Sequence, residues 1–158
     1  MKKVLILRLG ALGDIVHTTV IARAIKSAHP DWEVHYCSEA RYIHVLENNS
    51  DIDKIIPFDH KRKKDFSYNL EVALSLRHEH YDVILNLTNA FRNNLLTFIA
   101  QPKRKYGKVA MGDRHVVEAF FAAAKNAFPE LELPKNLKLG ISTEALASVR
   151  ERLEKFAH

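Results

Sequence analysis

The sequence has little cysteine and no long apolar run, and both absences narrow what it can be. Cys37 is the single cysteine among 158 residues, so an internal disulfide framework and a cysteine-based zinc site are both excluded. Such scarcity suits a reducing compartment. No segment approaches the roughly 20 apolar residues that span a bilayer. We therefore expect a cytoplasmic protein whose membrane contact, if any, is peripheral, at the inner face of the cytoplasmic membrane.

The composition is that of one globular domain with a basic surface. Apolar residues make up 47% of the chain, which is enough for a substantial core. The formal net charge is +5, and nine histidines add to it at lower pH. Such a balance favours anionic partners, among them phosphorylated sugars, nucleotides, nucleic acid and anionic membranes, without choosing between them.

Short runs rich in Val, Ile and Leu alternate with longer segments of helical periodicity. This alternation predicts a Rossmann-like, doubly wound α/β fold with a mostly parallel sheet. The expected strands cover residues 3–8, 33–37, 54–58, 82–87, 104–108 and 136–141, and the expected helices cover residues 15–28, 40–48, 67–80, 92–100 and 115–127.

A last helix is expected after Ser142 or Thr143, either of which would cap it. Its apolar residues recur at helical spacing and predict one side that packs on the domain. These residues are Leu146, Val149, Leu153 and Phe156. With no internal repeat and no low-complexity segment, residues 1–158 are interpreted as a single domain.

The loops that follow the strands are where a ligand site is expected. In open α/β sheets the site lies beyond the carboxyl ends of the strands, beside the point where the strand order reverses. The first such loop is "GALGD", residues 10–14. It lacks the middle glycine of a dinucleotide-binding turn and the Lys and Ser/Thr of a P-loop. An acid stands where a phosphate usually binds.

Two interpretations of this turn remain open from the residues alone. In one, Gly10 and Gly13 only allow a tight turn, and Asp14 caps the helix by accepting from the backbone N–H of Val16 or His17. In the other, the two glycines let the backbone come close to a ligand that Asp14 serves chemically.

The segment "ILRLGALGDIVHTT", residues 6–19, closely resembles the amino-terminal signature of the bacterial lipopolysaccharide heptosyltransferases of glycosyltransferase family 9. Looser similarity continues through "AHPDWEVHY", "DIDKIIPFD", "YDVILNL" and "STEALASVRERL". Members of this family have the GT-B architecture of two Rossmann-like domains. The resemblance implies that this chain is the amino-terminal, acceptor-binding domain, and that the carboxyl-terminal donor-binding domain is absent from it.

The resemblance implies a role for Asp14 as the catalytic base of an inverting glycosyltransferase. Such a base removes the proton of an acceptor hydroxyl as its oxygen attacks the anomeric carbon. Gly10 and Gly13 would admit the acceptor close to the backbone. The donor, ADP-heptose, is expected in the missing domain, so neither a cofactor nor a metal is expected here, and this chain alone is expected to be inactive.

A second candidate site is the basic run "HKRKKD". Taken alone, such a run is more often a solvated surface. The family resemblance implies that its four cations meet the acidic sugars and phosphates of the lipopolysaccharide core acceptor, a lipid A carrying acidic sugars. These residues are Lys61, Arg62, Lys63 and Lys64, and Arg114 is a weaker acceptor-binding candidate.

Two observations limit these expectations. Relatives often carry a D-x-H/Q-G pattern where this chain has Asn86 and Asn89. This difference bears on the identity of the acceptor more than on the class of reaction. No nucleic-acid-binding module is recognisable, so nucleic acid is not an expected partner.

The alternative function is that of a stand-alone α/β module that binds an acidic or phosphorylated ligand without catalysis.

Overall fold

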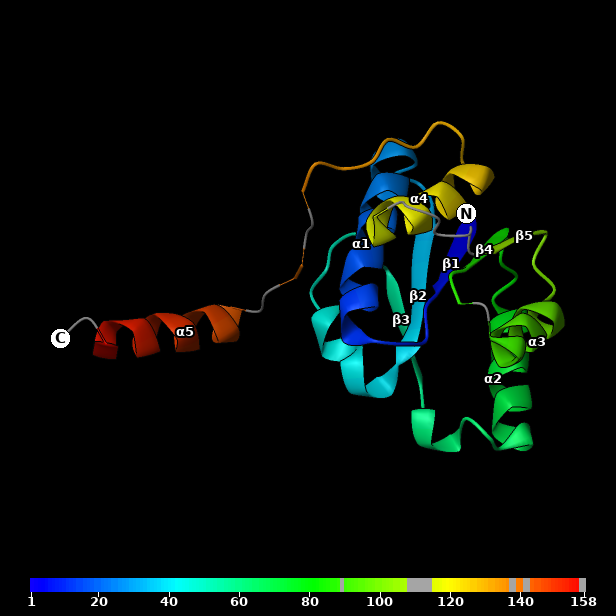
Figure 1. Ribbon diagram of the computed structural model, residues 1–158, viewed down its shortest axis with the longest axis horizontal. Coiled ribbons are helices and arrows are strands. Elements are labelled where there is room, and N and C mark those ends of the chain that lie inside the picture. Colours follow the sequence, from blue (N-terminus) through cyan, green and yellow to red (C-terminus); the bar gives the residue numbers. More distant parts are fainter. Residues whose placement is uncertain (89, 108–114, 137–138, 141–142, 157–158) are drawn as a thin grey trace.

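Runs of branched apolar residues form most of the strands of one five-stranded sheet (Figure 1). The structure is a computed structural model that describes residues 1–88, 90–107, 115–136, 139–140 and 143–156. All neighbouring strands are parallel, in the order β3-β2-β1-β4-β5. The strands are β1 (Lys3–Leu7), β2 (Glu33–Glu39), β3 (Lys54–Phe58), β4 (Val83–Asn86) and β5 (Arg104–Gly107).

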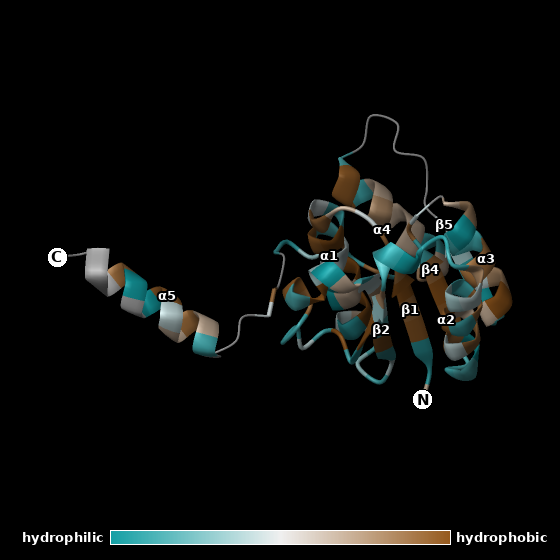
Figure 2. Ribbon diagram, turned by 90° about the horizontal axis from the view of Figure 1, so that it is seen from below, coloured by the Kyte–Doolittle hydropathy of each residue, from teal (hydrophilic) through white to brown (hydrophobic). Residues whose placement is uncertain are grey.

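Helices cover both faces of this sheet, as the predicted Rossmann-like class requires, and the prediction is confirmed. Alternate residues of β1 face opposite sides: Val4 and Ile6 belong to the core under α1 and α4, whereas Leu5 and Leu7 belong to the core under α2 and α3 (Figure 2). The helices are α1 (Leu12–Ala28), α2 (Phe66–His78), α3 (Phe91–Ala100), α4 (Val116–Ala127) and α5 (Thr143–Phe156).

Two predicted elements have different bounds or a different form. Helix α1 begins at Leu12, three residues before the predicted start, so the "GALGD" turn already belongs partly to the helix. The segment predicted as a helix over residues 40–48 is a 3₁₀ helix, η1 (Ala40–Val45). A short 3₁₀ helix, η2 (His60–Arg62), also occupies the basic run.

The strand predicted over residues 136–141 was wrong for the residues that can be compared. Asn136, Leu139 and Gly140 lie outside any strand, and the other three lie outside the described residues. Instead, Arg23 of α1 donates a hydrogen bond of 3.0 Å to the Asn136 carbonyl. A Cβ built on Gly140 would stand 2.0 Å from the carbonyl carbon of Asn48, so only glycine fits this approach.

Helix α5 forms at the predicted place but does not pack on the domain as expected. Figures 1 and 2 both show it standing away from the rest of the chain. Leu146, Val149 and Leu153 are consequently exposed. Among the described residues, no helix combines the length and the apolar character needed to cross a membrane.

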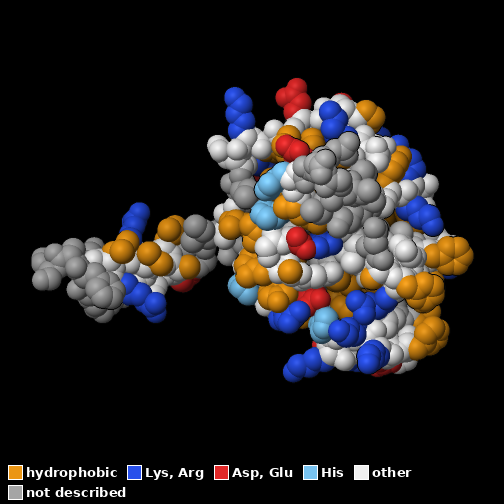
Figure 3. Space-filling view, viewed as in Figure 1, with side chains coloured by type: hydrophobic (Ala, Val, Ile, Leu, Met, Phe, Trp, Pro, Cys, Tyr) orange, Lys and Arg blue, Asp and Glu red, His pale blue; other side chains and the backbone are white. Residues whose placement is uncertain are grey.

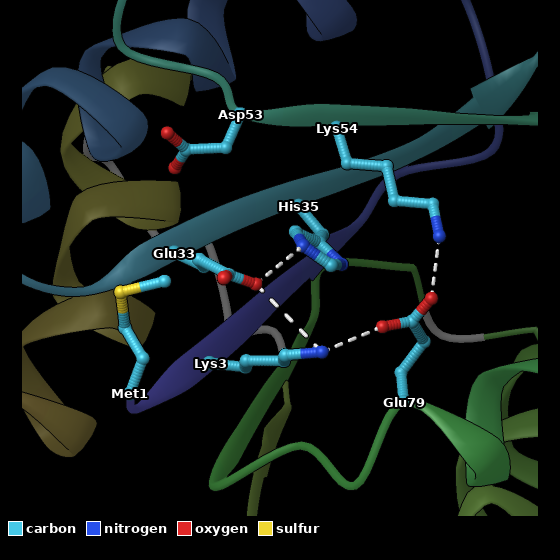
Figure 4. A pocket seen from close by; sticks show the side chains of 7 residues that line it. All are labelled: Met1, Lys3, Glu33, His35, Asp53, Lys54 and Glu79. Carbon is cyan, nitrogen blue, oxygen red and sulfur yellow. Dashed lines mark hydrogen bonds and ion pairs between the residues drawn. The ribbon is translucent and has the colours of Figure 1, made fainter.

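The amino-terminal edge of the sheet carries a hollow of about 450 Å³ whose charges neutralise one another (Figure 4). Glu79 accepts from Lys3 at 2.8 Å and also from Lys54. Glu33 pairs with Lys3 at 3.7 Å and contacts His35 at 3.2 Å. The hollow is lined by Met1, Lys3, Glu33, His35, Asp53, Lys54 and Glu79. Because the lysines and glutamates of this set pair within it, we assign the network to stability.

This network predicts a specific loss of stability in acid. The hydrogen bonds from Lys3 and Lys54 lower the pKa of Glu79 to about 2, from an ordinary value of 4.5. A carboxyl whose pKa falls on folding stabilises the fold above its unfolded pKa, and this contribution is lost as pH falls through the folded pKa. Glu79→Gln should therefore lower the free energy of unfolding by about 1 kcal/mol at pH 7 and flatten its decline between pH 4.5 and 2.

Urea unfolding followed by circular dichroism across that pH range measures both effects. Glu132→Gln, at an exposed position, is the matched control and should change neither. An unaltered pH profile in Glu79→Gln would contradict the assignment of the network to stability.

Candidate functional site

The first strand ends in a buried arginine at the point where the strand order reverses. Arg8 directly follows β1, the central strand, whose neighbours are β2 on one side and β4 on the other. Only 8% of its surface is exposed. Its backbone N–H donates to the Cys37 carbonyl at 3.0 Å, which continues the pairing with β2 beyond the strand. The charged group thus sits where a ligand site is expected in this class of sheet.

The guanidinium of Arg8 joins three elements. Nη1 donates to the Leu87 carbonyl at 2.6 Å and to Thr88 Oγ1 at 3.3 Å, both just beyond β4. Nη2 donates to Asp14 Oδ2 in the first turn of α1. The ring of Phe120, from α4, lies 4.8 Å from the guanidinium carbon. A buried charge needs such partners because leaving it unpaired is costly.

This ion pair replaces the helix cap that was one interpretation of Asp14. The N-cap residue of α1 is Ala11, and no side chain caps this helix start. The Asp14 carboxylate points back to Arg8 instead, so the capping interpretation was wrong. Its side chain is 30% exposed. Oδ2 is held by Arg8, while Oδ1 has no hydrogen-bond partner among the described residues.

Gly10 and Gly13 lie next to this ion pair, and the backbone conformation of neither position requires glycine. Neither has a left-handed backbone, for which glycine would be required. A Cβ on Gly10 would make ordinary contact with the Arg8 guanidinium, 3.4 Å away, and a Cβ on Gly13 would meet no described atom within 4 Å. The described chain therefore does not explain why both positions lack a side chain.

The basic run lies at the same edge, beyond β3, but its four cations are not equivalent. Arg62 pairs with Asp65 at 2.9 Å, and Lys63 Nζ lies 2.8 Å from His60 Nε2. Lys61 and Lys64 are exposed, and no ion pair within the described residues engages either. These two are therefore the cations available to an anionic ligand.

Besides pairing with Arg62, Asp65 caps the start of α2. Its carboxylate accepts from Ser67 Oγ at 2.7 Å and from the Tyr68 backbone N–H at 3.1 Å. Together with the bond from Arg62, these contacts lower the pKa of Asp65 to about 2. The ionised carboxylate thus caps the helix and offsets the Arg62 charge.

The buried carboxylate of Glu39 holds two side chains next to the basic run. The Glu39 side chain, 5% exposed at the end of β2, pairs with Arg41 at 2.7 Å and with His60 Nδ1 at 2.8 Å. Beside it a hollow of about 390 Å³ is lined by Ala40, Arg41, Asp59, His60 and Lys61. It opens at the carboxyl edge of the sheet, the edge that carries Asp14.

Other residues of this edge narrow the possible chemistry. Burial raises the pKa of the Cys37 thiol to about 12, so it remains a thiol rather than a nucleophilic thiolate. Asn86 Nδ2 donates to Asn94 at 2.9 Å and holds α3 against β4. Within the described segments, no three His, Cys, Asp or Glu side chains are placed to bind a metal ion. Arg114 and Asn89 lie outside the described residues.

Comparison with known sequences identifies relatives with one shared activity. The chain is 30% identical over 97 residues to a lipopolysaccharide heptosyltransferase 1 of Campylobacter coli, which covers 61% of this chain and 28% of that protein. It is 28% identical over 106 residues to the lipopolysaccharide core heptosyltransferase OpsX of Haemophilus influenzae, covering 67% and 30%. The chain is heptosyltransferase-like. No family model matches it.

Solved structures place the fold of this heptosyltransferase-like chain among glycosyltransferases. A glycosyltransferase of family 9 from Veillonella parvula superposes with a TM-score of 0.84 at 20% identity, over 99% of this chain and 50% of that one. The ADP-heptose lipopolysaccharide heptosyltransferase II of E. coli gives a TM-score of 0.74 at 18% identity, over 97% and 50%. The sheet and its covering helices thus have the Rossmann-like fold found in about half of each of these chains.

The heptosyltransferase-like chain spans less than a third of the length of these two curated relatives. Within its own span, sequence reasoning had selected Asp14, the glycines and the basic run but not Arg8. A signal for Arg8 was present in the sequence: it is the single charged residue in the otherwise apolar run "VLILRL". Arginine in such a run requires a buried partner.

The open space at Gly13 predicts that alanine there stabilises the fold. Gly13 lies in the first turn of α1, and alanine loses less backbone entropy than glycine on folding. Gly13→Ala should raise the free energy of unfolding by roughly 0.5 kcal/mol, measured by urea denaturation. Gly140→Ala is the contrasting control and should destabilise, because its Cβ meets the Asn48 backbone. Destabilisation by Gly13→Ala would show that the chain itself requires this glycine.

Proposed function

We propose that the protein is the acceptor-binding part of a heptosyltransferase-like enzyme that transfers heptose from ADP-heptose to a lipopolysaccharide inner-core acceptor, with inversion. The observation that carries the proposal is the partly exposed Asp14 carboxylate, held by buried Arg8 at the point where the strand order reverses. The heptosyltransferase names of the sequence relatives support the choice of donor and acceptor.

In the proposed reaction, Asp14 acts as the general base. Its oxygen Oδ1 takes the proton from an acceptor hydroxyl while the hydroxyl oxygen forms a bond to the anomeric carbon of the heptose. The bond from that carbon to the phosphate oxygen breaks, and ADP leaves with its electron pair. Attack opposite to the leaving group inverts the anomeric carbon.

Arg8 serves as a positioning residue in this scheme. It binds Oδ2 through Nη2, and its own place is fixed by the Leu87 carbonyl and the Phe120 ring. A base held on one oxygen keeps the other directed to the hydroxyl, which is the kind of positioning that gives large rate effects.

The remaining parts of the proposal concern binding. Gly10 and Gly13 leave room for the acceptor sugar beside the base. Lys61 and Lys64, the exposed cations of the basic run, attract its acidic sugars and phosphates. The nucleotide-sugar is proposed to bind a second, donor-binding domain, and the lipid part of the acceptor implies contact with the inner face of the cytoplasmic membrane.

The role of Asp14 predicts the effect of removing its charge. Asp14→Asn, assayed with a donor-binding half, ADP-heptose and a lipid A core acceptor, should lower kcat by a factor on the order of 10² or more. Asparagine still offers an oxygen to Arg8 but no negative charge, so the free energy of unfolding should fall by about 2 kcal/mol.

The matched control is Asp31→Asn, at an exposed position far from the turn in the sequence. Its kcat should equal that of the parent. A kcat for Asp14→Asn within a few-fold of the parent would reduce Asp14 to a partner of Arg8 and remove the proposed mechanism.

The two free lysines predict salt-dependent acceptor binding. Lys61→Gln combined with Lys64→Gln should raise the acceptor KM several-fold at low salt with little change in kcat, and the difference should shrink above about 0.5 M salt because exposed charges are screened. Lys125→Gln with Lys135→Gln removes the same charge from exposed positions elsewhere and should leave KM unchanged. Equal KM values for both double variants would show that the basic run is a solvated surface without a role in acceptor binding.

A further inference from the structure

The largest exposed apolar side chains of the sheet-bearing body gather on two neighbouring helices. Phe66 on α2 is 70% exposed, and Phe91 and Phe98 on α3 are 84% and 68% exposed. Leu70 and Leu74, also on α2, are 36% and 42% exposed. Phenylalanine is normally buried, so three of them so far in solvent on adjacent helices indicate an interaction surface.

The spacing of these residues places them on the outer side of each helix. Phe66, Leu70 and Leu74 recur every four residues, and Phe91 and Phe98 are seven apart, so each set follows one side. Other sides of the two helices pack on the sheet through residues such as Leu76 and Leu96. Helices α2 and α3 lie side by side (Figure 1), and apolar side chains line that margin of the molecule in Figure 3.

Positive charge surrounds this surface. Lys61 and Lys64 lie just before α2, and Arg77 is exposed in its last turn. Lys105 Nζ lies 5.9 Å from the Phe98 ring. Helix α3 contains no acidic residue, and the exposed acid of α2 is Glu71. Figure 3 shows Lys and Arg side chains next to the apolar margin.

We propose that the outer surface of α2 and α3 binds an anionic lipid bilayer, with Phe66, Phe91 and Phe98 inserted at the interface. Aromatic side chains flanked by lysine and arginine fit the boundary between acyl chains and anionic headgroups. A second copy of this chain fits less well, because a symmetric contact would bring the two sets of cations together. This proposal rests on the proposed function, because the lipid-anchored acceptor explains why the protein would bind a bilayer. Bilayer binding itself needs neither the sugar donor nor the acceptor.

The orientation of the helices relates this surface to the candidate site. Phe66 and Phe91 are the first residues of α2 and α3, and both helices start at the carboxyl edge of the sheet. That edge also carries Asp14 and the basic run. Binding through this surface therefore brings the open edge next to the headgroups, where a lipid-anchored acceptor would present its sugars, without covering Asp14.

Vesicle binding of the 158-residue chain tests the apolar part. Co-sedimentation with phosphatidylglycerol–phosphatidylethanolamine vesicles should show binding that weakens with salt, and pure phosphatidylcholine vesicles should bind at least about tenfold less. Phe66→Ser, Phe91→Ser and Phe98→Ser together should lower the partition coefficient on anionic vesicles by about tenfold or more. The matched control replaces three exposed apolar residues of α5, Leu146, Val149 and Leu153, by serine, and should bind like the parent.

The charge part is tested in the same assay. Lys61→Gln with Lys64→Gln should lower anionic-vesicle binding by about tenfold at low salt, whereas Lys125→Gln with Lys135→Gln should lower it much less. Circular dichroism confirms that each variant is folded.

Three results would overturn the proposal. They are no binding of the parent chain to anionic vesicles, loss of binding in the α5 variant but not in the α2–α3 variant, and a dimer in sedimentation analysis that the three phenylalanine substitutions abolish. None of these readouts involves glycosyl transfer, so a failure of the proposed reaction would be recognised separately by the Asp14 assay.

Discussion

The buried guanidinium of Arg8 is the constraint on which the candidate site depends. A positive charge withdrawn from water at the end of the central strand must find partners, and here they come from the chain beyond β4, from the first turn of α1 and from the ring of Phe120 on α4. The bond from Nη2 to Asp14 turns the Asp14 carboxylate towards Arg8. The Asp14 carboxylate therefore binds the arginine at the end of β1 and does not cap helix α1.

The two edges of the sheet use charge in different ways. At the amino-terminal edge, Lys3 and Lys54 pair with Glu33 and Glu79, so that two positive and two negative charges balance at the starts of the strands. At the carboxyl edge, Asp14 keeps an oxygen without a partner in the described part of the chain, and Lys61 and Lys64 stay in solvent. A parallel sheet places all of its following loops at this second edge, so Asp14 and the two lysines lie on the same side of the molecule. That asymmetry, together with the heptosyltransferase relatives, supports a substrate site there.

Local sequence patterns predicted most of the elements because strands and helices bury faces with different periods. The five strands of the sheet and all four helices that cover it were expected within a few residues. The predictions failed where the pattern was short or where a contact overrode it. Residues 40–45 form a 3₁₀ helix, and Gly140 lies against the backbone of Asn48 instead of in a strand of the sheet. Periodicity carries no information about such approaches between distant segments.

The sequence alone determined that an acid follows two glycines at the first strand-to-helix turn, and that a basic run follows the third strand. Only the tertiary structure decided what those residues do to one another. Arg8 meets a carbonyl 79 positions away, and this contact, invisible to local spacing, turns Asp14 from a possible cap into the partner of a buried cation. Likewise, four similar cations in a row became two that are tied by Asp65 and His60 and two that remain free. Pairing depends on which groups folding brings within reach, because charge–charge and hydrogen-bond energies depend on distance and burial rather than on residue order.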